Sequence, residues 1–393
     1  MSLKIGQGQS PNIGEFHTGA GAAKQALVSL GVSQAQAALV YISGPLQRRG
    51  IMEGVRSVLG NIPCATFSTV GGLLSSQEKF DDVITVTVFH SDHHLEFYEV
   101  KQVGNYPEET IRKFGEKLLD VRKKTTPQLF FLFSEGIAEH REILGERAVQ
   151  ILGGKCPVVG GAGGGFDLKK EGDNLSQSNV CRISGLMLGG KLETGLVSAQ
   201  AQVPFGHSHQ VTESDGYWVR SIGEYSTVRF YREFFGELER EGLGKEDILK
   251  WFSVYLLAVK EPTADNFFLT RPVNISNDGS IMFDRMITAG SEVRLALNDP
   301  EIARRAVKDA ARRSTRFLPV NPPTIIIFGP ENCRYWREEQ TRQMITETLE
   351  SVPDGPLVGG CYTLGQYVWL AGHDDLSGQS VFRNGNWVIC SIC

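Results

Sequence analysis

The chain has 393 residues, of which 41% are hydrophobic and 22% charged, and its formal net charge is -5. This composition predicts a soluble protein of more than one domain, and the lack of long basic runs does not favour a nucleic-acid surface. The N-terminus lacks a signal-peptide core, no apolar run is long enough to cross a bilayer, and the seven cysteines are scattered, so we expect a cytoplasmic protein without membrane contact or a disulfide framework.

The first elements that the sequence predicts are a helix and a strand. Residues 17–31 place apolar side chains at helical spacing and end at Gly31, a residue type that commonly ends helices. The strand-like run ALVYISG follows from Ala38, and a charged helical segment then ends near Leu59. A strand joined to a helix of this length favours a mixed α/β layer.

One pattern then occurs three times along the chain. An apolar strand is followed by an amphipathic helix, a short strand rich in proline and glycine, and a further strand. The Pro/Gly segments are LGNIPCATFSTVGGLL at 59–74, ILGGKCPVVGGAGGGF at 151–166 and VPDGPLVGGCYTL at 352–364. Because internal repeats set an architecture, we predict an α/β (mixed α+β) fold in which internally repeated strand-helix-strand-hairpin units form two mixed-sheet domains.

Adjacent glycines occur in the second and third of these segments. Without a Cβ, the main chain there can approach another group closely or adopt positive φ, so we expect glycine turns. We interpret these positions and a neighbouring tyrosine as candidates to close over a ligand, and a purely conformational role is the alternative. The candidates are Gly160, Gly161, Gly359, Gly360 and Tyr362.

Two pairs of β-rich runs have the pattern of hairpins. Residues 83–90 and 95–100 alternate apolar and polar side chains around the short segment SDHH. Residues 181–188 and 192–201 flank a glycine pair, which is a common hairpin signal. We therefore expect each pair to form an antiparallel hairpin.

The pattern of the chain changes after Pro204. The following segment predicts a strand, a turn and an aromatic-rich helix, and residues 267–298 predict strands around a hairpin turn. A charged helix then begins after Asp299-Pro300. We place a domain boundary near Asp215, which gives an N-terminal extension with the first helix (1–34), an N-terminal domain (35–215) and a C-terminal domain (216–393).

Polar side chains near predicted strand ends are candidate ligand groups. Cys333, Arg334 and Glu338 follow the strand TIIIFG where a helix begins, a common ligand position in α/β sheets. Arg334 could hold a carboxylate through two hydrogen bonds and Glu338 could bind an ammonium, whereas a helix N-terminal charge cluster is the alternative. Arg271 is a lone cation in an apolar run, so we expect it to pair with a nearby aspartate or a ligand anion.

Two histidines and two cysteines are the remaining candidates. In an extended strand His207 and His209 would face one side and could share a metal or approach a haem iron, whereas two exposed loop histidines are the alternative. The chain contains no G-x-S-x-G, H-E-x-x-H or P-loop motif. We therefore expect no enzyme, and an enzyme acting on a small carboxylate metabolite, with Cys333 or Cys361 as nucleophile, is the lesser alternative.

In their joint order these segments resemble a FIST protein, a family with paired N-terminal and C-terminal sensory domains. The resemblance runs from about Ala35 to about Leu370 and rests on CPVVGGAGGG, VTESDG, FFLTRPVNI, GSEVRLAL and GPLVGGCYTLGQ. It implies an intracellular signal-input protein that binds a small ligand such as an amino acid and acts on a partner such as a histidine kinase. A similar stand-alone subgroup, the NosP proteins, binds haem and responds to nitric oxide. Ligand and oligomeric state stay open.

Overall fold

The computed structural model divides the chain into two compact units. Unit 1 comprises residues 1–200, 304–382 and 386–393, and unit 2 comprises residues 201–303 and 383–385. The structure describes residues 3–43, 48–69, 72–74, 78–79, 83–92, 95–137, 140–163, 180–235, 248–249, 252, 254–260, 267–316, 318–331, 333, 338–354, 356–369 and 382–393. Among the described helices, none combines the length and apolar character that crossing a membrane requires.

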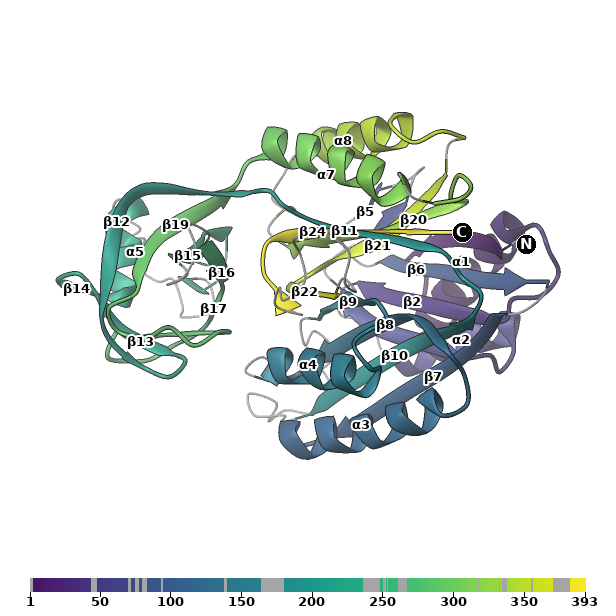
Figure 1. The fold of residues 1–393 in the computed structure, drawn as a ribbon, viewed down its shortest axis with the longest axis horizontal. Coiled ribbons are helices and arrows are strands. Elements are labelled where there is room, and N and C mark those ends of the chain that lie inside the picture. Colours follow the sequence, from purple (N-terminus) through teal and green to yellow (C-terminus); the bar gives the residue numbers. More distant parts are fainter. Residues whose placement is uncertain are drawn as a thin grey trace. The chain divides into compact units, whose positions relative to one another are not determined.

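The first repeat of unit 1 is a four-stranded sheet in the order β1-β6-β2-β3, of which Figure 1 labels β6 and β2. Strands β2 and β3 are parallel, and β6 is antiparallel to β1 and β2. The elements are β1 (Leu3–Pro11), α1 (Glu15–Leu30), β2 (Ala37–Ser43), α2 (Arg48–Leu59), β3 (Cys64–Thr69) and β6 (Val83–Ser91). The sequence had not indicated β1, whereas the predicted glycine end of α1 is confirmed by Gly31 at φ 70°.

The second repeat has the same topology, with the strand order β7-β10-β8-β9. Strands β8 and β9 are parallel, and β10 is antiparallel to both β7 and β8. The elements are β7 (Leu95–Gly104), α3 (Pro107–Arg122), β8 (Pro127–Glu135), α4 (Arg141–Ile151), β9 (Val158–Ala162) and β10 (Cys181–Gly190).

The third repeat contains the strands in the order β11-β24-β20-β21, again with one parallel pair and an antiparallel neighbour. Its elements are β11 (Thr194–Gln200), α7 (Pro300–Thr315), β20 (Thr324–Pro330), α8 (Glu338–Glu350), β21 (Leu357–Thr363) and β24 (Asn386–Ile392). Most of unit 2 is therefore inserted between β11 and α7. The predicted α/β class and the threefold repetition are confirmed.

Short strands join the sheets of different repeats. Strand β4 (Gly72–Leu74), which follows β3, pairs with β21 of the third repeat and with β5 (Glu78–Lys79). Strand β22 (Gly365–Trp369), which follows β21, pairs with β9 of the second repeat. Strand β23 (Phe382–Arg383) lies at the edge of that second sheet. Each exchange places backbone hydrogen bonds between repeats.

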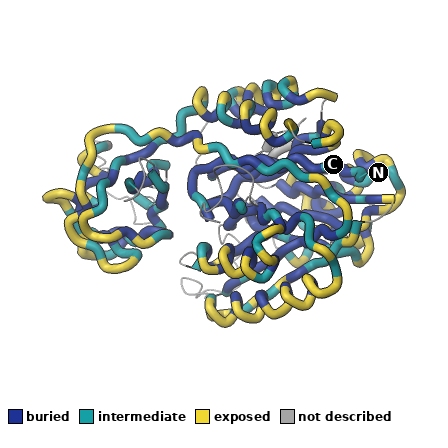
Figure 2. Tube along the Cα trace, in the orientation of Figure 1, coloured by how far each residue is buried: buried dark blue, intermediate teal, exposed yellow. Residues whose placement is uncertain are grey.

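The central strands of unit 1 are buried on both faces (Figure 2). On β8, Phe131 and Phe133 belong to a core that also contains residues of β2 and β20, whereas Phe130 and Leu132 belong to the core beneath α3 and α4. Successive side chains of a strand point to opposite faces, so both sets must be apolar. This double burial explains the continuous apolar runs in the sequence.

Both predicted hairpins are wrong. Strand β6 pairs with β1 and β2, whereas β7 pairs with β10; likewise β10 pairs with β7 and β8, whereas β11 pairs with β24. The chain passes from one repeat to the next at both places. Alternating side chains and a short polar connection indicate two consecutive strands, but they do not determine which neighbour each strand pairs with.

The predicted glycine turns are also wrong at the described positions, because Gly160 and Gly161 lie within β9 and Gly359 and Gly360 lie within β21. A Cβ on Gly160 would lie 2.0 Å from the carbonyl oxygen of Leu132 on the neighbouring strand. A Cβ on Gly360 would lie 1.8 Å from the corresponding oxygen of β20. Glycine is required here because φ is 151° at Gly160 and 140° at Gly360, so a Cβ would point at the neighbouring strand.

Unit 2 contains mostly antiparallel strands around its own core. The predicted strand, turn and aromatic-rich helix are confirmed, as is the hairpin between β17 and β18. The elements are β12 (Gln202–Asp215), β13 (Trp218–Ile222), β14 (Tyr225–Ser226), α5 (Thr227–Phe235), β15 (Leu256–Lys260), β16 (Phe267–Thr270), β17 (Pro272–Ile275), β18 (Ile281–Phe283) and β19 (Glu292–Asn298).

The compact units divide the chain differently from the predicted domains 1–34, 35–215 and 216–393, which stay predictions of the family boundaries.

The close approach at Gly160 yields a prediction about stability. We expect Gly160→Ala to lower the free energy of unfolding by about 3 kcal/mol, because the new methyl group would overlap a buried carbonyl. Gly154→Ala is the matched control, since Gly154 also has positive φ (67°) but its Cβ would meet nothing within 4 Å. Urea unfolding should show a loss of only about 1 kcal/mol for the control. Equal losses would refute the steric explanation.

Candidate functional site

Polar side chains gather at the carboxyl ends of the parallel strands of unit 1. These positions commonly carry ligand groups in α/β proteins. Each of these side chains is at most 3% exposed, although burying a polar group without partners is unfavourable. The set comprises Ser43, Ser68, Thr69, Ser134, Glu135 and Thr363.

The carboxylate of Glu135 lies at the centre of these contacts. Its Oε1 atom accepts hydrogen bonds from the backbone amide of Ser68 at 2.7 Å and from Nη2 of Arg48 at 2.5 Å. The same Arg48 nitrogen donates to Oγ of Ser68 at 2.9 Å. Glu135 ends β8 of the second repeat, whereas Arg48 begins α2 and Ser68 lies on β3 of the first. The carboxylate therefore joins two repeats.

The other oxygen of Glu135 has a different environment. Its Oε2 atom lies 3.9 Å from Nη1 of Arg182 on β10, and neither atom has a hydrogen-bond partner among the described residues. Glu135 is 3% exposed, and the side chains of Arg48 and Arg182 are each 19% exposed. One carboxylate thus lies between two guanidinium groups, and a buried acceptor and a buried donor lie side by side as an ion pair without a hydrogen bond.

Hydrogen bonds at the same strand ends connect the third repeat. Oγ of Ser134 lies 2.7 Å from the phenol oxygen of Tyr367 on β22. Oγ1 of Thr69 donates to the backbone carbonyl of Tyr362 on β21. Burial raises the pKa of the Tyr367 phenol above its usual value, with Ser134 and then Arg141 acting in the opposite direction. The phenol therefore stays protonated at neutral pH and can donate a hydrogen bond.

An arginine begins the second helix in two of the repeats. Arg48 is the first residue of α2 and Arg141 is the first residue of α4. Arg141 is only 5% exposed, and its guanidinium carbon lies 5.6 Å from the ring centroid of Phe382. Two cations, Arg48 and Arg182, thus lie beside one buried carboxylate, an arrangement that can accommodate an anionic or zwitterionic group.

The glycine candidates lie in unit 1, next to protein atoms. A Cβ on Gly161 would lie 2.4 Å from Cγ2 of Thr363, and one on Gly359 would lie 2.0 Å from the side-chain amide group of Gln7. These contacts explain the need for glycine without a ligand. Tyr362 is fully buried and its ring centroid lies 6.0 Å from that of Trp387.

The other ligand candidates of the sequence do not form one group. Cys333 is buried in unit 1, whereas Arg271 belongs to unit 2, where its backbone amide donates to Oδ1 of Asp284 at 2.9 Å. Arg334 and the side chain of Glu338 lie outside the described residues. Cys361 is buried, and burial raises the pKa of its thiol well above the usual value, which disfavours the thiolate that a nucleophile needs.

The two histidine candidates lie on β12 of unit 2. His207 is exposed, whereas the His209 ring packs edge-on against Phe230 and Phe234, at centroid distances of 5.0 and 5.8 Å. The pairing of β12 with β19 shifts its register between Phe205 and His209. Among the described residues, no group of three His, Cys, Asp or Glu side chains could hold a metal ion.

Sequence reasoning missed Arg48, Ser68, Glu135 and Arg182. One signal was present, because Glu135 ends a run of apolar residues at the carboxyl end of β8, where ligand groups often occur. The contact between Arg48 and Glu135, however, spans 87 positions of the chain. Only the folded arrangement of two repeats brings these side chains together.

One of three comparisons with known proteins finds a family that matches part of the chain. Residues 36–224, just under half of the chain, match the family model of the FIST N domain. No curated protein matches the chain. Among solved structures, a cyanuric acid hydrolase from A. caulinodans is 9% identical, with a TM-score of 0.28 over 47% of this chain and 70% of that one. A second cyanuric acid hydrolase structure is 9% identical, with a TM-score of 0.31 and full coverage of both chains.

The environment of His209 yields a prediction about pH. Burial, and secondly His207, lowers the pKa of His209 in the folded protein, so the unfolded chain binds a proton more readily. The contribution of this neutral side chain to stability is present above the unfolded pKa of about 6.5 and is lost as pH falls through the lower folded value. His209→Asn should flatten the dependence of the unfolding midpoint on pH in this window. His207→Asn should retain most of it, and an unchanged profile in His209→Asn would contradict the assignment.

Proposed function

We propose, from the FIST N domain over residues 36–224, that this protein is a signal-input protein that binds a small ligand in unit 1. FIST domains form a sensory domain family, which supports a receptor role. The observation that carries the choice of site is the pair formed by Glu135 Oε2 and Arg182 Nη1. Both atoms are buried without a hydrogen-bond partner among the described residues, and they lie 3.9 Å apart.

The chemistry of this pair favours a ligand that both donates and accepts hydrogen bonds. Glu135 can accept from an ammonium or hydroxyl group, and Arg182 can donate to a carboxylate. A zwitterionic amino acid carries both functions on neighbouring atoms, in agreement with the ligand class that the family resemblance implies. Arg48 supplies a second cation within 2.5 Å of the same carboxylate, so the site would also tolerate an anionic ligand.

The missing hydrogen bonds of Glu135 Oε2 and Arg182 Nη1 favour ligand binding. A buried polar atom without a partner costs about 1–3 kcal/mol, and a ligand that supplies the missing hydrogen bonds recovers part of this cost. Oε1 of the same carboxylate accepts hydrogen bonds from Ser68 and Arg48 of the first repeat. A ligand bound to Oε2 would therefore lie at the contact between two repeats. A ligand that binds one of two arrangements of this junction more tightly than the other would raise the population of the first. We propose that a protein partner, such as a histidine kinase, responds to that shift.

The assignment of Arg182 yields a ligand-binding prediction. Thermal unfolding with each of the common amino acids and small dicarboxylates should identify ligands that raise the midpoint, since a ligand stabilises the state it binds. For the best of these, Arg182→Ala should weaken binding by about 10- to 100-fold in titration calorimetry, because charged hydrogen bonds contribute about 1.5–3 kcal/mol.

Arg56→Ala provides the control for this experiment. Arg56 lies exposed in the last turn of α2 and makes no ion pair within the described part of the chain. Arg56→Ala therefore removes one arginine, as Arg182→Ala does, without breaking a described ion pair. This variant should bind like the original protein. Equal affinity of Arg182→Ala and the original protein, with an unchanged fold, would place the ligand elsewhere.

A haem-binding, nitric-oxide-sensing role of the NosP type is the alternative proposal, supported by the family resemblance alone. Haem titrated into the full chain should then give a stoichiometric Soret band that His207→Ala or His209→Ala removes. The described surroundings of these histidines favour the opposite result, a spectrum of free haem that neither substitution changes. A stoichiometric band that depends on either histidine would replace the amino-acid proposal.

A further inference from the structure

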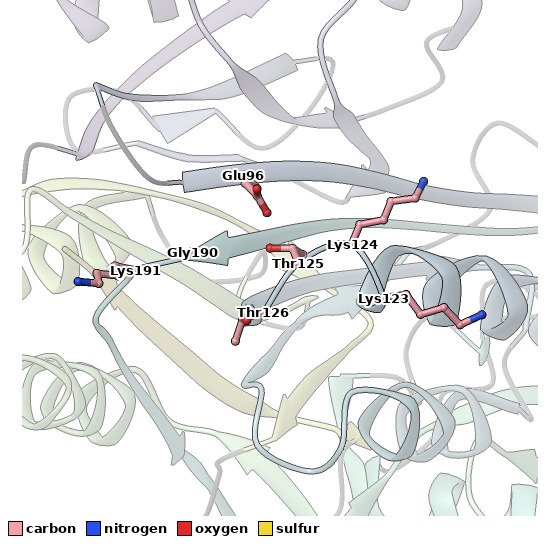
Figure 3. A pocket seen from close by; sticks show the side chains of 7 residues that line it. All are labelled: Glu96, Lys123, Lys124, Thr125, Thr126, Gly190 and Lys191. Carbon is pink, nitrogen blue, oxygen red and sulfur yellow. The ribbon is translucent and has the colours of Figure 1, made fainter.

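A basic groove lies at the end of the second repeat that is opposite to Glu135. It is open to solvent, has a volume of about 800 Å³ and is lined by residues before β8, at the end of β10 and at the start of β7 (Figure 3). Since β8 has nine residues, the groove lies roughly 25 Å from the Glu135 carboxylate along the strand. The lining residues are Glu96, Lys123, Lys124, Thr125, Thr126, Gly190 and Lys191.

Positive charge exceeds negative charge in this groove, although the whole chain has a net charge of -5. Lys123 pairs with Asp120 at 3.0 Å, whereas Lys124 and Lys191 make no ion pair within the part of the chain that the structure describes. A local surplus of this sign attracts anions and accelerates their encounter with the surface.

The backbone at the centre of the groove is firmly packed. Thr125 lies against Gly189 of β10 so closely that a Cβ there would be 1.9 Å from the threonine Oγ1. The amide of Gly190 donates to the carbonyl of Thr126 at 3.3 Å. The α3–β8 connection and the end of β10 therefore hold the lysines on a fixed frame instead of a free loop.

The directions of the lysine side chains decide between two kinds of anion. In Figure 3 the ammonium group of Lys191 points away from those of Lys123 and Lys124. A single phosphate group would require these ammonium groups to converge on one point. Separated cations along an open groove instead match charges that are spread along an extended chain.

We propose that this groove binds an extended acidic segment of a partner protein. Glutamate or aspartate side chains spaced along the segment would contact Lys191 at one end and Lys124 at the other, and the threonine hydroxyls between them can donate further hydrogen bonds. Exposed ion pairs are individually weak and are screened by salt. Binding should therefore be fast, moderate in affinity and strongly dependent on ionic strength. The inference does not depend on which ligand unit 1 binds.

A labelled oligoglutamate peptide and an oligoglutamine peptide of the same length test this proposal on the full chain. Fluorescence anisotropy at low salt should detect binding of the acidic peptide only. The double substitution Lys124→Glu and Lys191→Glu should weaken it by at least about tenfold. The control is the double substitution Lys24→Glu and Lys155→Glu, at exposed lysines without an ion pair among the described residues, which changes the net charge equally.

The control separates the groove from a general charge effect. Binding that the control variant retains within about twofold, and that salt abolishes, would support the proposal. Equal losses in both double variants would overturn it, as would an absence of peptide binding at low salt. Displacement of the peptide by inorganic pyrophosphate at far lower concentration than by citrate, a carboxylate of similar charge, would also overturn it, because the groove would then be a phosphate site.

Discussion

Two repeats supply the groups that surround the carboxylate of Glu135. This carboxylate in turn links polar side chains at the strand ends of unit 1. A buried carboxylate is stable only when charges and hydrogen bonds compensate its desolvation. The Ser68 amide and Arg48 provide this on one oxygen, while Arg182 lies beyond hydrogen-bond distance of the other. The desolvation of Oε2 is only partly compensated. This property makes the junction a candidate ligand site as well as a structural ion pair.

The repeats share a topology but not their polar side chains. In each, a parallel strand pair brings two carboxyl ends to the same edge of its sheet, and the exchanged strands β4 and β22 tie these sheets together. The first repeat supplies Arg48 and Ser68, and the second supplies Glu135 and Arg182. Different side chains on a repeated backbone therefore produce one asymmetric polar cluster.

Insertion of unit 2 into the third repeat follows a simple physical rule. The chain leaves unit 1 after β11 and returns in α7, and the third sheet nevertheless has the same strand order as the first two. Loop-closure entropy grows slowly with length, so a long insertion costs little more than a short one when its residues form a core of their own. The separate apolar cluster of unit 2, built around Phe230, Tyr231 and Leu295, meets that condition.

Local patterns in the sequence determined the repeated strand–helix units, the glycine end of α1 and the start of α7 at Pro300, because these features depend on side-chain periodicity and on neighbouring residues. The tertiary structure alone decided strand partners, the burial of Gly160 and Gly360 inside strands, and the contact of Arg48 with Glu135. These features join segments distant in the chain, and their geometry depends on how three sheets pack. No local pattern carries that information, since an alternating strand fits several neighbours and a charged residue carries no mark of its partner.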